Sequence, residues 1–74
     1  MRATAKTDII VRAANIETPR RARAGKDQSI SAGEDLPVIQ VLGHPETRQD
    51  RWTLVLARRG YRLFVRARDF HLEE

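Results

Sequence analysis

The sequence contains no cysteine, and this absence removes two common ways of stabilising a chain of 74 residues. Neither a disulfide nor a thiolate-bound metal can form. A chain of this length buries only about 60% of the surface that its unfolded form exposes, so its stability must come from one compact core, helped where needed by a partner or a second copy. We therefore expect one small domain at residues 8–74, after a disordered N-terminus at residues 1–7. A homo-oligomer is compatible with so small a core.

Long apolar runs are also missing from the chain. A membrane-spanning helix needs about 20 consecutive apolar residues, and no stretch of this sequence approaches that length. The first residues, M-R-A-T-A-K-T-D, lack the apolar region of a secretory signal. We therefore expect a cytoplasmic protein of bacterial type, with no membrane among its partners.

Lysine is scarce among the basic residues. Lys6 and Lys26 are the only lysines among 14 basic residues, the others are all Arg, and the formal net charge is +4. Arginine is the better bidentate ligand for phosphate and carboxylate groups. The arginine excess is open to two interpretations, a solvated surface or a surface that meets an anionic partner.

The stretch from Arg51 to Leu72 holds the only Trp, the only Tyr and both Phe residues. Residues 51–58 and 61–68 alternate as two strands around a short turn at Arg59-Gly60. One face of these strands is apolar and should close the core, with Trp52, Leu54, Leu56, Leu63 and Val65, followed by Phe70 and Leu72. The opposite face of the second strand carries Arg62, Phe64, Arg66 and Arg68.

The upstream segments predict further strands. Residues 8–16 are rich in β-branched side chains, and residues 34–43 alternate, with Leu36 and Val38 on one face and Gln40 sharing it. Between them, residues 17–33 contain turn formers and the basic cluster Arg20, Arg21 and Arg23, which predicts a long mobile loop. The sequence therefore predicts an all-β fold, a single small barrel of five short strands with a long loop after the first strand and a 3₁₀ turn near the C-terminus.

Four short motifs resemble the Src-homology-3 family. They are I30-S-A-G-E-D-L-P-V-I, the pair R51-W52, the turn residue Gly60 and the ending F64-V-R-A-R-D-F-H-L. The resemblance covers Ile30 to Leu72 and implies a small barrel that serves as an interaction module. The chain departs from the family in its first strand, which has no aromatic residue, and in lacking the proline before the 3₁₀ turn. Only Trp52 and Phe70 could remain of the family's aromatic shelf, so a polyproline ligand is not implied.

No pattern in the sequence indicates catalysis or a cofactor. His44 and His71 have no spacing that requires a metal site, and neither Ser29 nor Ser31 lies in a nucleophile elbow. The glycines do not form a phosphate loop. We therefore expect a non-enzymatic protein without catalytic, cofactor or metal sites.

Two binding hypotheses remain. The first is a protein–protein interaction module that uses Trp52 and Phe70 together with Arg20, Arg21 and Arg23. The second is a DNA- or RNA-binding barrel that uses Arg62, Phe64, Arg66 and Arg68, because alternate side chains on a strand stand about 7 Å apart, comparable to phosphate spacing, and Phe64 offers a stacking surface. A solvated face, with arginine stems covering Phe64, is the competing interpretation of the same row, and an acidic protein partner is a third.

Overall fold

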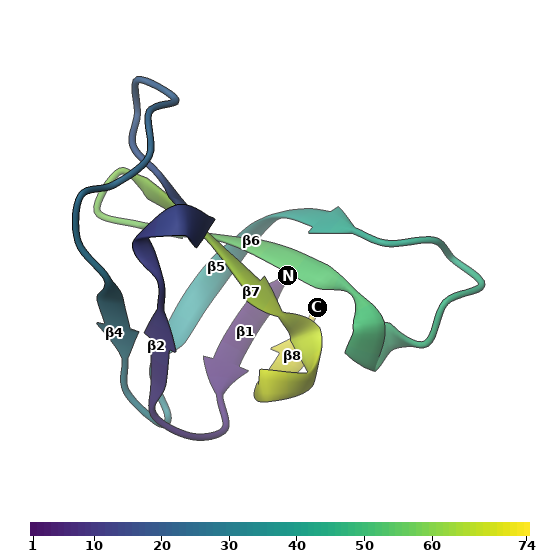
Figure 1. The fold of residues 1–74 in the computed structure, drawn as a ribbon. Coiled ribbons are helices and arrows are strands. Elements are labelled where there is room, and N and C mark those ends of the chain that lie inside the picture. The colour runs from purple at the N-terminus through teal and green to yellow at the C-terminus, as the bar shows by residue number, and fades with distance from the viewer.

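The computed structural model describes residues 1–74 and contains strands and short 3₁₀ turns but no α-helix (Figure 1). The all-β prediction is confirmed. None of the 3₁₀ elements, each a single turn of three residues, is long and apolar enough to cross a bilayer. In chain order the elements are β1 (Arg2–Ala5), β2 (Ile9–Val11), η1 (Ala13–Asn15), β3 (Ile16–Glu17), β4 (Gln28–Ile30), β5 (Asp35–Leu42), η2 (Gln49–Arg51), β6 (Thr53–Arg58), β7 (Tyr61–Arg66), η3 (Ala67–Asp69) and β8 (Phe70–Glu73).

The strands form two antiparallel sheets. The larger has six strands in the order β3-β7-β6-β5-β1-β8, and the smaller pairs β2 with β4. The prediction of a closed barrel of five strands is wrong, because the chain has eight strands and no ladder joins the two sheets. The two edge strands of the larger sheet, β3 with two residues and β8 with four, do not pair with each other. The predicted 3₁₀ turn near the C-terminus is present as η3.

The centre of the larger sheet is the β6–β7 hairpin, in register from Thr53–Arg66 to Arg58–Tyr61. Its turn has positive φ angles at Arg59 (51°) and Gly60 (84°), as a two-residue hairpin turn requires. The predicted alternation is confirmed, since Leu54, Leu56 and Leu63 are fully buried. The core cluster consists of Ala3, Ala5, Val11, Ile16, Ile30, Leu36, Leu54, Leu56, Leu63, Val65, Ala67 and Phe70.

The N-terminus departs from the prediction of disorder at residues 1–7. β1 lies between β5 and β8, and its Ala3 and Ala5 side chains are 0% and 3% exposed. Alanine side chains are small enough for β1 to pack closely on the core, but they give the sequence only a weak apolar signal. The pairing of β1 with β8 also brings the two ends of the chain close together (Figure 1).

Residues 17–33 are also more ordered than predicted. They contain the end of β3 and all of β4, and Ile30 of β4 is completely buried. In β5, the register shifts between Val38 and Gln40. This bulge turns Val41 toward the core in place of Gln40, which is exposed, so the strict alternation expected for this strand does not hold.

Arg58 links the smaller sheet to the larger one. One guanidinium nitrogen, Nη1, donates to the Ser29 carbonyl at 2.8 Å and to Glu34 Oε2 at 3.0 Å, and the other, Nη2, donates to Gln28 Oε1 at 3.0 Å. The Arg58 side chain is only 17% exposed. One partly buried side chain therefore satisfies three acceptors on β4 and the loop after it.

A carboxylate fixes the segment between β2 and β4. Asp27 accepts hydrogen bonds from the Ala13 backbone N–H at 2.9 Å and from Arg12 Nη1 at 3.0 Å. Both hydrogen bonds lower the pKa of Asp27 below its ordinary value of 3.8, and the bond from the Ala13 backbone has the larger effect.

The lowered pKa predicts a pH effect on stability. A carboxylate whose folded pKa is depressed stabilises the fold above its unfolded pKa and loses that contribution as pH falls through the folded value. We expect the Asp27→Asn variant to be less stable than the wild type at neutral pH, and the difference to shrink as the pH falls below about 3.8. Urea unfolding of both proteins at several pH values measures this, and a difference that stays constant down to acid pH would contradict it.

Candidate functional site

The side of the β6–β7 hairpin that faces away from the core carries arginine around an aromatic ring. Arg62 and Arg66 of β7 are exposed, and Phe64 between them is half-buried. The cross-strand partner of Phe64 is Val55, which is 1% exposed but does not belong to the core cluster. Because its neighbours Leu54 and Leu56 point into the core, Val55 points to this outer face. Val55 is covered, so Phe64 is the apolar side chain that forms the floor of the outer face.

A second hairpin stands beside this floor. Arg21 N donates to the Thr18 carbonyl and Thr18 N donates to the Ala22 carbonyl, both at 2.8 Å, and Glu17 pairs with Arg23 through an isolated bridge. Its tip contacts the β6–β7 turn, because a Cβ atom added at Gly60 would lie 3.4 Å from Pro19 Cγ. The basic cluster predicted on a mobile loop is thus held on a hairpin that rests on the main sheet.

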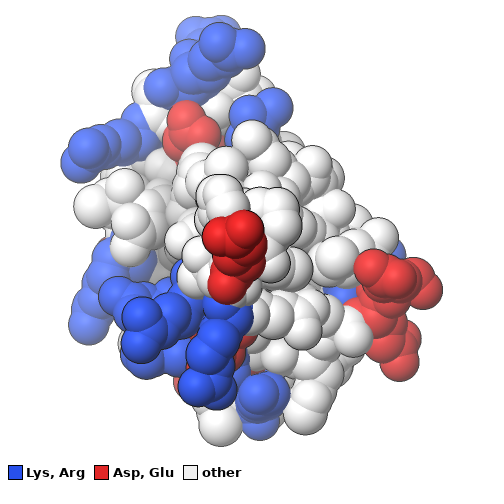
Figure 2. Space-filling view, turned by 90° about the vertical axis from the view of Figure 1, so that its right-hand side faces the viewer, with Lys and Arg blue, Asp and Glu red and all other residues white.

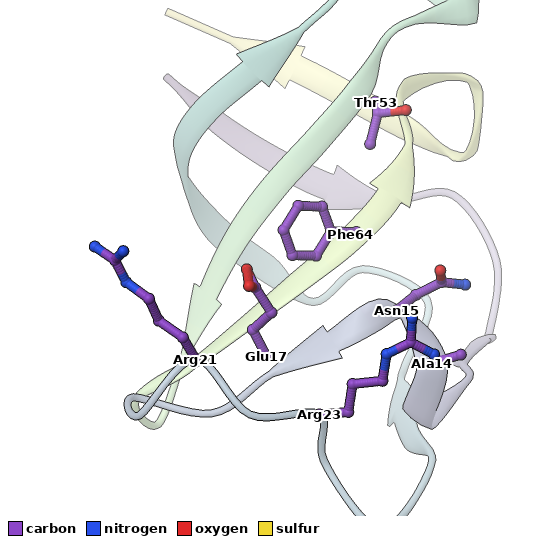
Figure 3. A pocket seen from close by; sticks show the side chains of 7 residues that line it. All are labelled: Ala14, Asn15, Glu17, Arg21, Arg23, Thr53 and Phe64. Atoms are coloured by element: carbon purple, nitrogen blue, oxygen red, sulfur yellow. The ribbon is translucent and has the colours of Figure 1, made fainter.

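A cavity of about 450 Å³ opens between the two hairpins (Figure 3). Figure 3 shows the Glu17 carboxylate turned toward the Phe64 ring, with Arg21 and Arg23 on either side of Glu17. The residues that line the cavity are Ala14, Asn15, Glu17, Arg21, Arg23, Thr53 and Phe64. Its volume lies in the range of ordinary ligand pockets, and its floor is one aromatic ring surrounded by polar groups.

Neighbouring depressions continue this cavity across the sheet. One shares Thr53 with it and is also lined by Asp50, Arg51, Arg66 and Arg68. Another shares Glu17 and Arg21 with it and is also lined by Arg62. Figure 2 shows Lys and Arg side chains gathered along one side and at the top of the view, with the larger acidic group at the opposite edge. We call the surface lined by these three depressions the arginine face, and its arginines are Arg21, Arg23, Arg51, Arg62, Arg66 and Arg68, around Phe64.

The six arginines of the arginine face form no ion pairs within the protein. The four ion pairs of the molecule use other arginines and join Arg2 to Asp35, Arg12 to Asp27, Arg48 to Asp50 and Arg58 to Glu34. None of the six guanidinium groups of the arginine face has a carboxylate oxygen within 4.0 Å. Such groups are free to form bidentate bonds with an external phosphate or carboxylate.

The structure separates the residues predicted to bind a protein partner. Phe70 is 3% exposed and belongs to the core, so it offers almost no surface to a partner, although it borders a depression together with His71 and Leu72. Trp52 is half-buried, its Nε1 donates to the His44 carbonyl at 3.3 Å, and it lines none of the cavities. The predicted surface that combines Trp52 with Phe70 is therefore not assembled. Arg20 is exposed at the hairpin tip and lines no cavity either.

The second predicted group is largely brought together. Arg62, Phe64 and Arg66 share the outer face of β7, as the alternation predicted. Arg68 lies in η3 rather than on the strand, but it lines the same depression as Arg66. The sequence also carried no sign that Arg51 would join this surface, because Arg51 precedes β6 and reaches the arginine face only through the η2 turn.

Glu17 is a second functional candidate that the sequence analysis did not identify. It is half-buried in β3 and opposite Arg62 on β7. The one available signal was its place as the only acidic residue just before the R-R-A-R cluster, which by itself suggests only a solvated charge.

Comparisons of the chain with protein-family models, with curated proteins and with solved structures found no match. The resemblance to a Src-homology-3-type barrel therefore stays a prediction.

Arg21 adopts an unfavourable backbone conformation. Its φ of 60° lies in the left-handed region, which costs a residue other than glycine roughly 1–2 kcal/mol. We expect Arg21→Gly to raise the unfolding free energy by about 0.5–1 kcal/mol while removing one guanidinium from the arginine face. Urea unfolding measures the change, and Arg20→Gly, at the preceding position without a positive φ, is the control and should not stabilise. Equal effects of the two substitutions would contradict the prediction.

Proposed function

We propose that this protein is a non-enzymatic binding module that binds single-stranded nucleic acid on the arginine face. The observation that carries the proposal is the set of six arginines without carboxylate partners around a half-buried phenylalanine on the outer face of a β-sheet. Arginines that lack internal partners supply the contacts to phosphates, and an aromatic ring among them supplies a surface for a base.

The position of Phe64 favours a single strand over a duplex. Its ring forms the floor of a depression whose sides carry Arg21 and Arg23. A duplex keeps its bases stacked and would offer only phosphates to such a surface, whereas an unstacked base can enter the depression and lie on the ring. Stacking of a base on an aromatic side chain contributes about 1–3 kcal/mol.

An acidic protein segment is the main competitor for the same arginines. It would satisfy the guanidinium groups but would leave Phe64 without a stacking partner. The protein–protein hypothesis used Trp52 and Phe70, and Phe70 is buried in the core. Binding of a protein partner stays a prediction.

The salt dependence of binding tests the proposal. We expect a fluorescently labelled oligonucleotide of about 12 nucleotides to bind at about 50 mM salt, and the plot of log K against log salt to have a slope of about −2 to −4, because each phosphate contact to a single strand contributes roughly −0.7. An abasic strand of equal length is the matched control and should bind more weakly, since it keeps the phosphates and lacks the stacking. No detectable binding at low salt, or equal binding of the abasic strand, would contradict the proposal.

A further inference from the structure

We infer that the cavity beside Phe64 is a base-binding subsite that selects guanine, with Glu17 accepting hydrogen bonds from the base. This inference rests on the proposed function and adds a base preference to it. It starts from a feature that simple phosphate binding does not explain, namely a carboxylate without an ion-pair partner that lines the Phe64 cavity beside Arg21 and Arg23.

Glu17 is held in a defined position. Ile16, the residue before it, is 1% exposed and pairs with Leu63, while Glu17 itself pairs with Arg62 on one side and bridges to Arg23 on the other. These pairings fix the Glu17 backbone relative to Phe64, since Phe64 lies on the same strand as Leu63 and Arg62.

The carboxylate of Glu17 has no partner within the protein. It takes part in none of the ion pairs and in none of the side-chain hydrogen bonds of the molecule. It lines the cavity together with Phe64 and Asn15, and it points toward the ring (Figure 3). A carboxylate placed here repels phosphates, so it weakens the binding of a nucleic-acid backbone unless it contacts a group that donates hydrogen bonds.

Guanine is the base that fits such an acceptor. An ionised carboxylate only accepts hydrogen bonds, and its two oxygens can receive two parallel bonds from adjacent donors. The Watson–Crick edge of guanine presents two adjacent donors, N1–H and N2–H₂. Adenine and cytosine present one amino group beside an acceptor nitrogen, and thymine or uracil presents one N–H between two carbonyl oxygens. A base stacked on Phe64 with its edge toward Glu17 is therefore bound best when it is guanine.

The two arginines beside Glu17 complete the subsite. Arg21 and Arg23 flank the carboxylate on the second hairpin and lack ion-pair partners. They can hold the phosphates on either side of the stacked nucleotide. The subsite thus combines a ring for the face of the base, a carboxylate for its edge and two guanidinium groups for its backbone.

A set of four oligonucleotides that differ at one central base tests the inference. Each is a thymine-rich strand with G, A, C or T at its centre, and a single guanine avoids association through guanine tetrads. We expect the wild type to bind the G strand about tenfold more tightly than the others, in line with roughly 1–3 kcal/mol for a bidentate base contact. In Glu17→Gln we expect affinity for the A, C and T strands to rise, because a repulsive charge is removed, and the preference for G to fall to about twofold or less.

The control variant is Asp50→Asn, which removes an acidic charge that lies next to the arginine face and is paired with Arg48. Asp50 lines the depression beside Arg66 and lies outside the Phe64 cavity, so this change should raise affinity for all four strands and leave the G preference intact. Free GMP should compete far more weakly than the G strand, because it lacks the neighbouring phosphates.

The outcomes are distinct. A wild type without base preference, or a Glu17→Gln variant that keeps the full preference, overturns the guanine subsite while the proposed nucleic-acid binding stands. Failure of the wild type to bind any strand at low salt overturns the proposed function itself. GMP binding as tight as the G strand overturns the assignment of a strand as the ligand.

Discussion

Replacing Arg62 and Arg66 together with Ala is expected to weaken oligonucleotide binding by about 100-fold. Each is an exposed arginine without an ion-pair partner, next to Phe64 on β7, and each charge-assisted hydrogen bond lost to a phosphate corresponds to about 1.5 kcal/mol or more, roughly tenfold in affinity. The salt slope should become shallower by about 1.4, because two phosphate contacts to a single strand are lost. Fluorescence anisotropy across a salt series measures both quantities.

The matched control removes the same charge from outside the arginine face. Arg20 and Arg59 are exposed, have no ion-pair partner and line none of the depressions. Their joint replacement with Ala should lower affinity by about threefold or less, through the long-range field alone. If the control lost as much affinity as Arg62→Ala with Arg66→Ala, the net charge would be the cause and the arginine face would not be a site.

Replacing Arg58 with Met is expected to destabilise the fold by about 2 kcal/mol. Methionine keeps the apolar stem, but the Glu34 carboxylate, the Gln28 amide and the Ser29 carbonyl lose their shared donor in a partly buried position. For a domain of this size the midpoint of thermal unfolding should fall by about 8–16 °C. Thermal unfolding followed by circular dichroism measures this. Arg59→Met, at the neighbouring exposed position, should change the midpoint little, and equal losses would contradict the role assigned to Arg58.

The β6–β7 hairpin was predictable because local signals agree there. Alternation of apolar and polar residues, the Arg59-Gly60 turn and the concentration of aromatic residues all indicate the same two strands, and Leu54, Leu56 and Leu63 are buried as expected. The same alternation placed Arg62, Phe64 and Arg66 on the opposite face. A period of two residues fixes both faces of a strand at once, so a correct core also yields a correct outer surface.

The terminal strands and the loop were not predictable on the same basis. β1 is a short strand whose buried residues are alanines, and it is ordered by its two neighbours β5 and β8 rather than by its own side chains. The bulge in β5 depends on pairing with β6, which no local pattern encodes. The predicted 3₁₀ turn is present at Ala67–Asp69, but no strand was predicted after it, and Phe70 begins β8, which pairs with β1.

The composition of the site depends on contacts that are distant in sequence. Arg21, Arg23 and Glu17 approach Phe64 only because β3 pairs with β7, across more than forty residues of chain. Phe70 was predicted both to close the core and, by resemblance, to belong to an aromatic shelf, and its 3% exposure agrees with the first role. Local patterns could therefore identify the arginine row but not the acidic residue that gives the cavity its chemical character.

Backbone amide shifts during titration with the single-guanine strand test the central claim most directly. If the arginine face binds the strand, the largest changes in a two-dimensional ¹H–¹⁵N spectrum should fall on Glu17, Arg21, Arg23 and residues 62–68, and the Phe64 ring protons should move upfield under the stacked base. Residues of β1 and β8, in the other half of the larger sheet, should change little. Changes confined to β1 and β8, or no change at low salt, would contradict the account.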